Sequence, residues 1–223
     1  VGTAPCDDAV TQTITVATAL DASWTVPTGI CETDAPFDLS TFITGDVGGT
    51  WSGTGVTGTM FDPSVGTQTI TYTVGTGGCQ ATSAQSVSVD VTPDPSWTTL
   101  TTCISGSAID LNTTITGTTG GSWSGTGVTG SNFDPSAGTQ ALTYRVTSGA
   151  CTVSSTQSVP VLDPTPSTTP THVSCFGLTD GAASTTMTGG SGNYTYSWNP
   201  SCQTGANPSG LGAGTYMVTI TDV

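Results

Sequence analysis

Hydrophobic and polar residues alternate along several short segments of this chain. Ile70, Tyr72 and Val74 fall on one face of a strand, with threonines between them, and residues 85–89 alternate in the same way. A period of two is typical of a half-buried β-strand. Gly75–Gly78 stands between the two segments and predicts a turn, so we expect the pair to form a hairpin.

This strand pattern occurs twice, because the chain contains a long near-copy of itself. Trp51–Val89 and Trp123–Val161 align without a gap at a shift of 72 residues, and 25 of their 39 positions are identical. Upstream, Phe37–Gly45 matches Ile109–Gly117 at the same shift. A repeat of this length indicates an array of small domains. About seven short strands in each unit are typical of an immunoglobulin-like sandwich.

Proline-rich segments follow both units and set the predicted domain boundaries. Such segments are extended and semi-rigid, so we expect an all-β chain of tandem immunoglobulin-like β-sandwich domains in an extended rod with Pro/Thr-rich joints. The predicted parts are an orphan last strand at 1–20, Ig-like repeat 1 at 21–92, Ig-like repeat 2 at 93–164, and a β-sandwich module lacking its last strand at 165–223.

The composition agrees with a β-fold and narrows the range of partners. Thr, Val, Gly and Ser dominate, which favours strands and turns over helices. The formal charge is -14, with one Lys or Arg and one His. A chain that cannot neutralise phosphates is not expected to bind nucleic acid or an anionic membrane surface. No apolar run approaches 18 residues, so no membrane insertion is expected.

The last module differs from the two repeats in sequence. Its characteristic residues are Val173-Ser174-Cys175, Asp180-Gly181, Gly189-Gly190, Tyr194–Trp198, Leu211-Gly212-Ala213-Gly214-Thr215-Tyr216 and Thr219–Asp222. This pattern resembles the SprB-type repeat of very large surface adhesins from gliding Bacteroidota. The two earlier repeats resemble the immunoglobulin- or PKD-like repeats of proteins secreted by the same bacterial group, through GTWSGTGV and FDPS. The resemblance implies an extracellular, secreted, multidomain surface protein and no catalytic chemistry.

The N-terminal segment matches the strand that the last module lacks. Members of the resembled family continue after the final TxTD with one more strand, whereas this chain stops at Val223. A Gln stands six residues after a Cys at three places: Cys6 and Gln12, Cys79 and Gln85, Cys151 and Gln157. We therefore expect residues 1–20 of one copy to complete the last module of the preceding copy, which gives a head-to-tail homopolymer. One alternative is that the 223 residues are one period of a longer covalent array, and another is a fragment with a disordered start and an unpaired last module.

Seven cysteines indicate an oxidising compartment. Each repeat has one early and one late Cys, so the predicted disulfides are Cys31–Cys79 and Cys103–Cys151. Cys175 is expected to bond Cys6 of a neighbouring copy, with Cys202 as the alternative partner. There is no CxxC and no His cluster, so no metal site and no cofactor are predicted. Ca²⁺ is the one metal that the many carboxylates could collect, but no segment has the spacing of a Ca²⁺ loop.

No set of residues predicts an enzyme. His172 and Cys175 are close in sequence, but His172 stands in a Pro/Thr-rich joint and Cys175 is assigned to a disulfide. Asp62 and Asp134 stand in FDPS, where Asp followed by Pro and Ser is a turn signal rather than half of a carboxylate pair. The chain has no Lys, no second His and no GxSxG motif.

Several residues are candidate glycosylation sites. Asn112 and Asn193 begin formal N-glycosylation sequons, and hydroxyl side chains in the predicted joints are candidates for O-glycans: Thr98, Thr99, Thr101, Thr102, Ser167, Thr168 and Thr169.

The tryptophans and tyrosines divide into two predicted classes. Those at strand positions are expected in the core: Trp51, Trp123, Trp198, Tyr72 and Tyr144. Trp24 and Trp97, near the predicted joints, are the candidates for surface aromatics that could stack on sugars, and they could equally pack in contacts between domains. The predicted function is a structural repeat unit of an extracellular fibre or adhesin stalk, with glycans as covalent partners or adhesion targets. The alternative is an array of carbohydrate- or surface-binding modules attached to a secreted enzyme.

Overall fold

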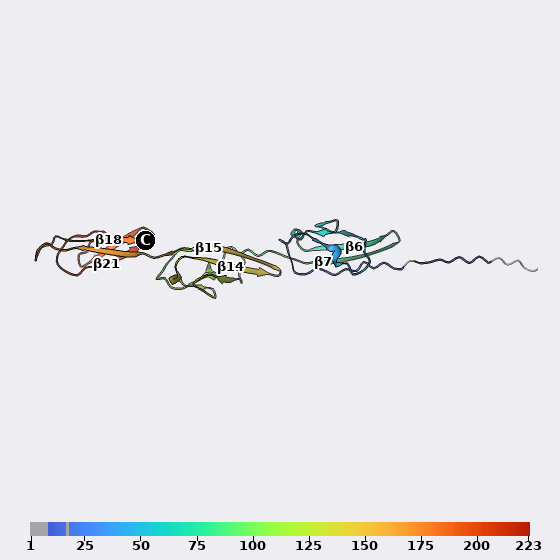
Figure 1. Ribbon diagram of the computed structural model, residues 1–223, viewed down its shortest axis with the longest axis horizontal. Coiled ribbons are helices and arrows are strands. Elements are labelled where there is room, and N and C mark those ends of the chain that lie inside the picture. Colours follow the sequence, from blue (N-terminus) through green and yellow to red (C-terminus); the bar gives the residue numbers. More distant parts are fainter. Residues whose placement is uncertain (1–8, 17) are drawn as a thin grey trace, which may run out of the picture. The chain divides into compact units, whose positions relative to one another are not determined.

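The computed structural model describes residues 9–16 and 18–223, and its regular structure there consists of β-strands and short 3₁₀ helices (Figure 1). The predicted all-β fold is therefore confirmed, and the sheets fit β-sandwich domains. By contacts the chain forms two units. One contains the residues up to Thr92 together with Ser148–Cys151, and the other contains Pro93–Thr147 together with Thr152–Val223.

The first repeat contains a three-stranded sheet β3–β6–β7, a small sheet β2–β5–β4 and a parallel pair β1–β8. The bounds are β1 Ile30–Cys31, β2 Phe37–Asp38, η1 Leu39–Phe42, β3 Thr50–Ser52, β4 Val56–Thr57, β5 Met60–Phe61, η2 Pro63–Val65, β6 Gln68–Thr76, β7 Cys79–Val87 and β8 Val89–Asp90. The predicted hairpin is β6–β7, and the late Cys opens its second strand.

The second repeat has the same sheets at the same spacing: β11–β14–β15, β10–β13–β12 and β16–β9. The bounds are β9 Thr102–Cys103, β10 Ile109–Asp110, η3 Leu111–Thr114, β11 Ser122–Ser124, β12 Val128–Thr129, β13 Asn132–Phe133, η4 Pro135–Ala137, β14 Gln140–Ser148, β15 Cys151–Val159 and β16 Val161–Leu162.

The inward face of β6 is the one that the alternation predicts. Ile70, Tyr72 and Val74 are all buried. Trp51 on β3 stands opposite Tyr72, and their rings lie 4.6 Å apart between centroids. The second repeat repeats this contact, and the predicted core aromatics of both repeats are confirmed as buried.

The prediction that Trp24 and Trp97 lie on the surface is wrong. Each is only 4% exposed. Trp24 packs edge-to-face on Trp51 with centroids 5.0 Å apart, and Trp97 packs on Trp123 in the same way. The sequence places both near predicted joints, but the first segment of each repeat lies against the sheet, where an aromatic pair gains both burial and edge-to-face contact.

A tyrosine hydroxyl anchors the loop before β3. The Tyr72 hydroxyl donates to the Asp46 carbonyl and accepts from the Gly49 amide, both at 2.9 Å. A Cβ on Gly49 would collide with the Tyr72 ring. Gly49 therefore permits the close approach of backbone and ring on which both hydrogen bonds depend.

The terminal module has two small sheets, β17–β18–β20 and β19–β21. The bounds are β17 Thr165–Thr171, β18 Gly181–Thr188, β19 Tyr194–Asn199, β20 Ser209–Leu211 and β21 Met217–Asp222. Trp198 is buried, as predicted. One expectation is corrected: the segment before Thr171 is no free joint, because Thr165–Thr171 pairs along its whole length with β18.

We predict that Gly49→Ala lowers the free energy of unfolding by about 2–4 kcal/mol, because the added methyl would collide with the Thr73 backbone carbonyl as well as with the Tyr72 ring, so that both must shift. The control is Gly78→Ala, whose Cβ would meet nothing within 4 Å and whose equivalent in the second repeat is Ala150. Calorimetry of both variants measures the effect, and equal melting temperatures would contradict it.

Candidate functional site

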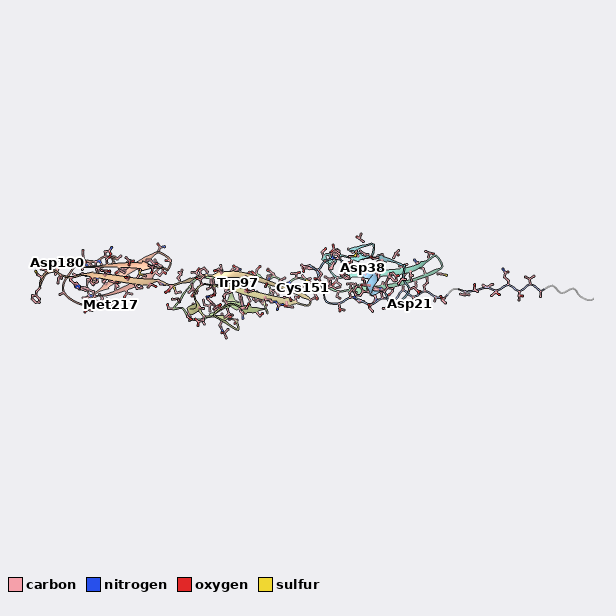
Figure 2. The ribbon with its side chains drawn as sticks, viewed as in Figure 1. Asp21, Asp38, Trp97, Cys151, Asp180 and Met217 are labelled. Carbon is pink, nitrogen blue, oxygen red and sulfur yellow. A yellow bond between two sulfur atoms is a disulfide. The ribbon has the colours of Figure 1, made fainter. Side chains whose placement is uncertain are left out.

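The terminal module has open strand edges among the described residues, and two of them, on β21 and β17, lie beside a groove. β21 pairs with β19 alone, and β17 is the outer strand of its sheet. Met217, at the start of β21, is 61% exposed (Figure 2). An unpaired edge offers a row of N–H and C=O groups to another strand.

A groove runs beside these edges. One hollow of about 280 Å³ is lined by β17 and β21 residues, among them Pro166, Val218 and Ile220. A second hollow of about 340 Å³ is lined by Trp198, Leu211 and other residues. Thr168 lines both hollows, so they adjoin along β17. Apolar side chains and open main chain thus lie together in one groove.

The core of the terminal module is small. Its buried cluster consists of Ala183, Trp198 and Leu211, with Tyr216 and Val218 packed against it. The buried cluster of the first repeat has eleven members, and the buried last-strand residue Val87 is one of them. The terminal module lacks that contribution within the described residues.

The N-terminal segment exposes the side chains that the repeats bury. Val10, Ile14 and Val16 alternate with threonine and glutamine, and they are 90%, 88% and 90% exposed. At the shift that aligns the cysteines, Ile14 corresponds to Val87, which is 0% exposed, and Val16 corresponds to Val89, which is 7% exposed. Residues 1–8 and 17 of the predicted orphan strand lie outside the described residues.

The repeats show what the last strand does. The Gln85 side-chain amide donates to the Trp24 carbonyl at 2.6 Å, and Gln157 donates to the Trp97 carbonyl at 2.6 Å. The last strand of each repeat therefore holds the first segment of that repeat in place. Gln12 is the corresponding residue of the N-terminal segment.

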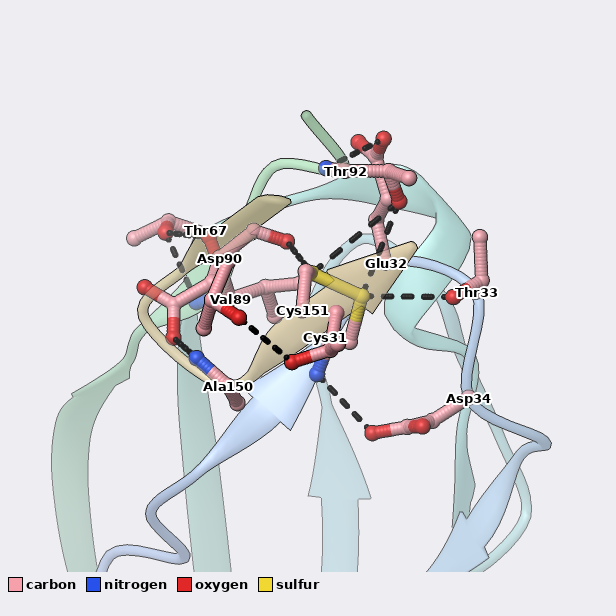
Figure 3. Close-up of a disulfide and its surroundings, with 12 residues drawn as sticks. Cys31, Glu32, Thr33, Asp34, Thr67, Val89, Asp90, Thr92, Ala150 and Cys151 are labelled. Atoms are coloured by element: carbon pink, nitrogen blue, oxygen red, sulfur yellow. Dashed lines mark hydrogen bonds between the residues drawn. A yellow bond between two sulfur atoms is a disulfide. The ribbon is translucent and has the colours of Figure 1, made fainter. Parts of the chain in front are cut away.

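A disulfide joins Cys31 to Cys151, with their Cα atoms 5.1 Å apart (Figure 3). The predicted pairs Cys31–Cys79 and Cys103–Cys151 are wrong in this structure. Cys31 lies opposite Asp90, just beyond the end of β7, whereas Cys79 begins β7. A nine-residue strand spans roughly 27 Å, and a disulfide requires Cα atoms within about 7 Å. The two cysteines of one repeat thus lie at opposite ends of a long strand.

The remaining described cysteines are Cys79, Cys103, Cys175 and Cys202, and all four are exposed free thiols. Cys175 and Cys202 are therefore not bonded to one another. The expected bond from Cys6 to Cys175 of another copy involves a residue outside the described part, and it stays a prediction.

The candidate chemical groups are not assembled into a catalytic or metal site. Within residues 9–16 and 18–223, no group of three His, Cys, Asp or Glu side chains is placed to hold a metal ion. His172 lines the larger hollow, and Cys175 is exposed near it in sequence. Asp62 and Asp134 cap the short helices η2 and η4, which agrees with their interpretation as turn residues.

Six aspartates, in capping and turn positions, share one electrostatic feature. Their carboxylates accept hydrogen bonds from the amide or hydroxyl of a nearby serine. Backbone hydrogen bonding from Ser64 holds the pKa of Asp62 below its usual 3.8, and the Ser40 amide does the same for the pKa of Asp38. The pKa is lowered in the same direction at Asp21, Asp94, Asp134 and Asp180. These groups stabilise local turns and do not mark a reactive centre.

The candidate glycosylation residues are accessible, with one exception. The two asparagines are exposed, and so are the hydroxyl residues apart from the half-buried Thr102. Asn112 already accepts a hydrogen bond from the Trp123 indole at 3.1 Å, and Thr99 donates to the Ser158 carbonyl at 2.9 Å. Ser167, Thr168 and Thr169 lie on β17 rather than in a joint.

Sequence reasoning missed two features of this site. The first is the pairing of the early Cys of one repeat with the late Cys of the next, for which the 72-residue repeat gave no signal. The second is the groove along β17, because a Pro/Thr-rich segment reads as a linker. The alternation of Val10, Ile14 and Val16 was a signal for the N-terminal segment, and it matches the pattern of a buried strand face.

A family model described as SprB repeat matches residues 167–202. The predicted resemblance of the terminal module is thereby confirmed, and it supports a surface adhesin-like repeat protein with structural rather than catalytic domains. A search of the curated proteins finds no match. In the part of the chain that the structure describes, no helix is long and apolar enough to cross a membrane.

We predict that Cys151→Ser destabilises the first unit of the unassembled chain. The bond closes a sequence separation of 120 residues, and the chain-entropy model assigns such a loop about 5 kcal/mol. The control is Cys79→Ser, which removes an exposed free thiol at the equivalent position. Calorimetry without reductant should show a lower melting temperature for Cys151→Ser alone.

We predict acid destabilisation that begins below about pH 4. The six carboxylates have folded pKa values below the unfolded value near 3.8, so their contribution is complete above that pH and is lost as pH falls through the folded pKa. Urea midpoints should be equal at pH 7 and 5 and lower at pH 3. In the Asp62→Asn/Asp134→Asn variant, each amide keeps one oxygen that can accept the serine hydrogen bond but does not titrate. Between pH 7 and pH 3 this variant should lose less stability than the wild-type chain.

Proposed function

We propose that this chain is a structural repeat unit of an extracellular bacterial fibre or adhesin stalk, and that copies join head to tail. In each joint, residues 6–16 of one copy occupy the groove of the preceding copy and add a strand to β21. The observation that carries the proposal is the pairing of an open groove with an exposed segment of matching pattern. Main-chain hydrogen bonds would give affinity, and alternate side chains would give specificity.

The comparison with the repeats supports the place of the added strand. In the first repeat Trp51 stands opposite Tyr72, and β7 pairs with the other edge of β6. In the terminal module Trp198 stands opposite Val218. β19 and β21 thus correspond to β3 and β6, and the strand corresponding to β7 is the one that the joint supplies.

The direction of the added strand follows from the same correspondence. β7 is antiparallel to β6, and its first residue pairs with Thr76, so the same correspondence places residue 6 beside Asp222 and residue 11 beside Met217. Residues 12–16 then continue past the start of β21. Val10, Gln12 and Ile14 then face the groove, as Ser83, Gln85 and Val87 face the core of the first repeat. Val10 then stands opposite Val218 of the smaller hollow. Gln12 and Ile14 come beside Tyr216 and Gly214, which line the larger hollow.

The hydrophobic contribution is large enough for a stable joint. Burying a Val or Ile side chain contributes roughly 1.5–3 kcal/mol, so three such side chains contribute roughly 5–9 kcal/mol before the cost of ordering the segment. The proposed joint depends on apolar and main-chain contacts rather than on charge, because each copy carries a formal charge of -14. The same charge keeps the sides of neighbouring units apart.

Two alternatives give different experimental outcomes. In a longer covalent array, residues that follow Val223 would supply the same strand, and native material would keep its length in SDS with reductant. A carbohydrate-binding array would need exposed aromatics. The two tryptophans expected in that role, Trp24 and Trp97, are buried, and Phe176 is the one large aromatic that the described residues leave fully exposed. Covalent glycans on the exposed Thr and Asn residues are compatible with a fibre surface and belong to the proposal.

We predict that Ile14→Asp abolishes assembly, because a carboxylate cannot enter the apolar groove without losing its hydration. The matched control is Thr13→Asp, which adds the same charge on the opposite face of the strand. Both residues are exposed in the single chain, so neither change should affect its folding. Light scattering and negative-stain electron microscopy measure filament formation.

A binding measurement isolates the groove. A peptide of residues 6–18 should bind to the chain lacking residues 1–16, and the Ile14→Asp peptide should bind at least tenfold more weakly by calorimetric titration. Filaments from the Ile14→Asp chain, or equal binding of the two peptides, would contradict strand addition.

A further inference from the structure

The Cys31–Cys151 disulfide is part of a defined joint, which we describe as a tip and a socket. The tip is Ser148–Cys151, between β14 and β15, and the socket is Cys31 with Asp90 opposite it (Figure 3). The Ala150 amide donates to the Asp90 carboxylate at 2.7 Å, and the Cys151 sulfur lies 3.1 Å from the Asp90 carbonyl oxygen. A bond thus joins the early Cys of one repeat to the late Cys of the next.

The chain contains a second socket with the same backbone. Cys103 stands opposite Leu162 in the parallel pair β9–β16, as Cys31 stands opposite Asp90. The Ile104 amide donates to the Leu162 carbonyl at 2.9 Å, which repeats the 3.0 Å bond from Glu32 to Asp90. Cys103 is exposed and free. The socket is therefore formed, and no described cysteine of this chain is bonded to Cys103.

The sequence offers one tip whose chemistry fits this socket. In the bonded joint, Ala150 precedes the tip cysteine and donates its N–H to the Asp90 carboxylate. In the second socket Leu162 stands at the position of Asp90, so no carboxylate is there to accept such a hydrogen bond. Pro5 precedes Cys6, and proline has no N–H to donate. Relative to the bonded joint, the second socket has no carboxylate acceptor and Pro5 has no N–H donor. Pro5-Cys6 would therefore leave no unpaired amide in the Cys103 socket. Cys6 lies outside the described residues, and this step rests on its sequence position.

The added strand would begin next to Cys103. Leu162 lies opposite Cys103, and the carbonyl of the following residue, Asp163, packs against Gly189. The next glycine packs against the Asp222 carboxylate at the end of β21. A strand antiparallel to β21 starts at this end of the module, where its first residues come near the socket.

We infer that Cys103 forms a disulfide with Cys6 of the following copy, so that the joint between copies repeats the Cys31–Cys151 joint within a copy. The inference rests on the proposed head-to-tail assembly, and it replaces the expected pairing of Cys6 with Cys175. The same rule pairs Cys175, which follows the first strand of its module, with Cys79 of the following copy. Cys202 remains a thiol.

The β6–β7 turn, which carries the free Cys79, supports the pairing of Cys79 with Cys175. Gly77 has φ +61°, like Gly149 with φ +55°, so the β6–β7 turn has the left-handed glycine of the bonded tip. β17 runs along the length of the module, from Thr165 opposite Thr188 to Thr171 opposite Ala182. Cys103 lies beside Leu162, just before the start of β17, and Cys175 follows its end, so the two cysteines lie at opposite ends of the module. The added strand would lead out at that end, towards the repeat that bears Cys79.

Bond formation needs an oxidant of the disulfide class. The thiolate of one cysteine attacks the oxidant's disulfide and releases one thiol, and the partner thiolate then attacks the mixed disulfide and releases the second. The protein loses two thiol protons and two electrons, and the oxidant becomes two thiols. Oxidised glutathione is the probe in the experiment.

Peptide mapping tests the pairing directly. Cleavage before aspartate places each of the seven cysteines in its own peptide, because at least one Asp separates every neighbouring pair of cysteines. Filaments formed from equal amounts of ¹⁴N- and ¹⁵N-labelled chains are oxidised, alkylated and digested without reductant. Linked peptides Cys6–Cys103 and Cys79–Cys175 should each include mixed-isotope species, while Cys31–Cys151 should not, and Cys202 should be alkylated.

Variants separate this inference from the proposed function. Cys103→Ser/Cys175→Ser should still form filaments but should lose the SDS-stable ladder in non-reducing gels, whereas Cys202→Ser should keep it. Filaments that contain a Cys6–Cys175 link, or alkylated Cys6 and Cys103, would overturn the inference and leave strand addition standing. Failure of the wild-type chain to form filaments would overturn both.

Discussion

In each repeat, both the main sheet and the first segment depend on the last strand. β7 completes the sheet that begins with β3, and its Gln85 side chain holds the carbonyl of Trp24 in the first segment. That hydrogen bond keeps Trp24 against Trp51, so the strand fixes the position of residues about sixty positions upstream. A domain of this size buries a modest share of its surface, and one missing strand removes a large part of its core.

The terminal module shows the result of that dependence. Its buried cluster has only three residues, and β21 lacks the neighbouring strand that β7 provides for β6 in the first repeat. The exposed Val10, Ile14 and Val16 carry the same pattern in a segment that has no sheet of its own. The match to the family model described as SprB repeat covers residues 167–202, which lie within this module.

The sequence predicts features that depend on local alternation and on the repeat. The inward face of β6, the hairpin before Cys79 and the burial of Trp51 follow from period and spacing alone. The disulfide pairing and the burial of Trp24 could not be predicted, because they depend on where a residue lies in the folded repeat. Cys31 and Cys79 belong to one repeat in sequence, but a full strand length separates them in space. Trp24 stands near the predicted start of repeat 1, and its burial depends on a contact with a strand far along the chain.

The Cys31–Cys151 disulfide determines which parts of the chain bear a mechanical load. A pull applied along the chain passes from Cys31 directly to Cys151 through the covalent bridge, since the bond spans a sequence separation of 120. The strands between those residues, including the long hairpin β6–β7, are therefore shielded from tension and cannot be drawn out. Force reaches the residues before Cys31 and after Cys151, which include β16 and all the strands of the terminal module. Elongation is therefore confined to those parts, whatever the thermal stability of the sheets inside the bridge.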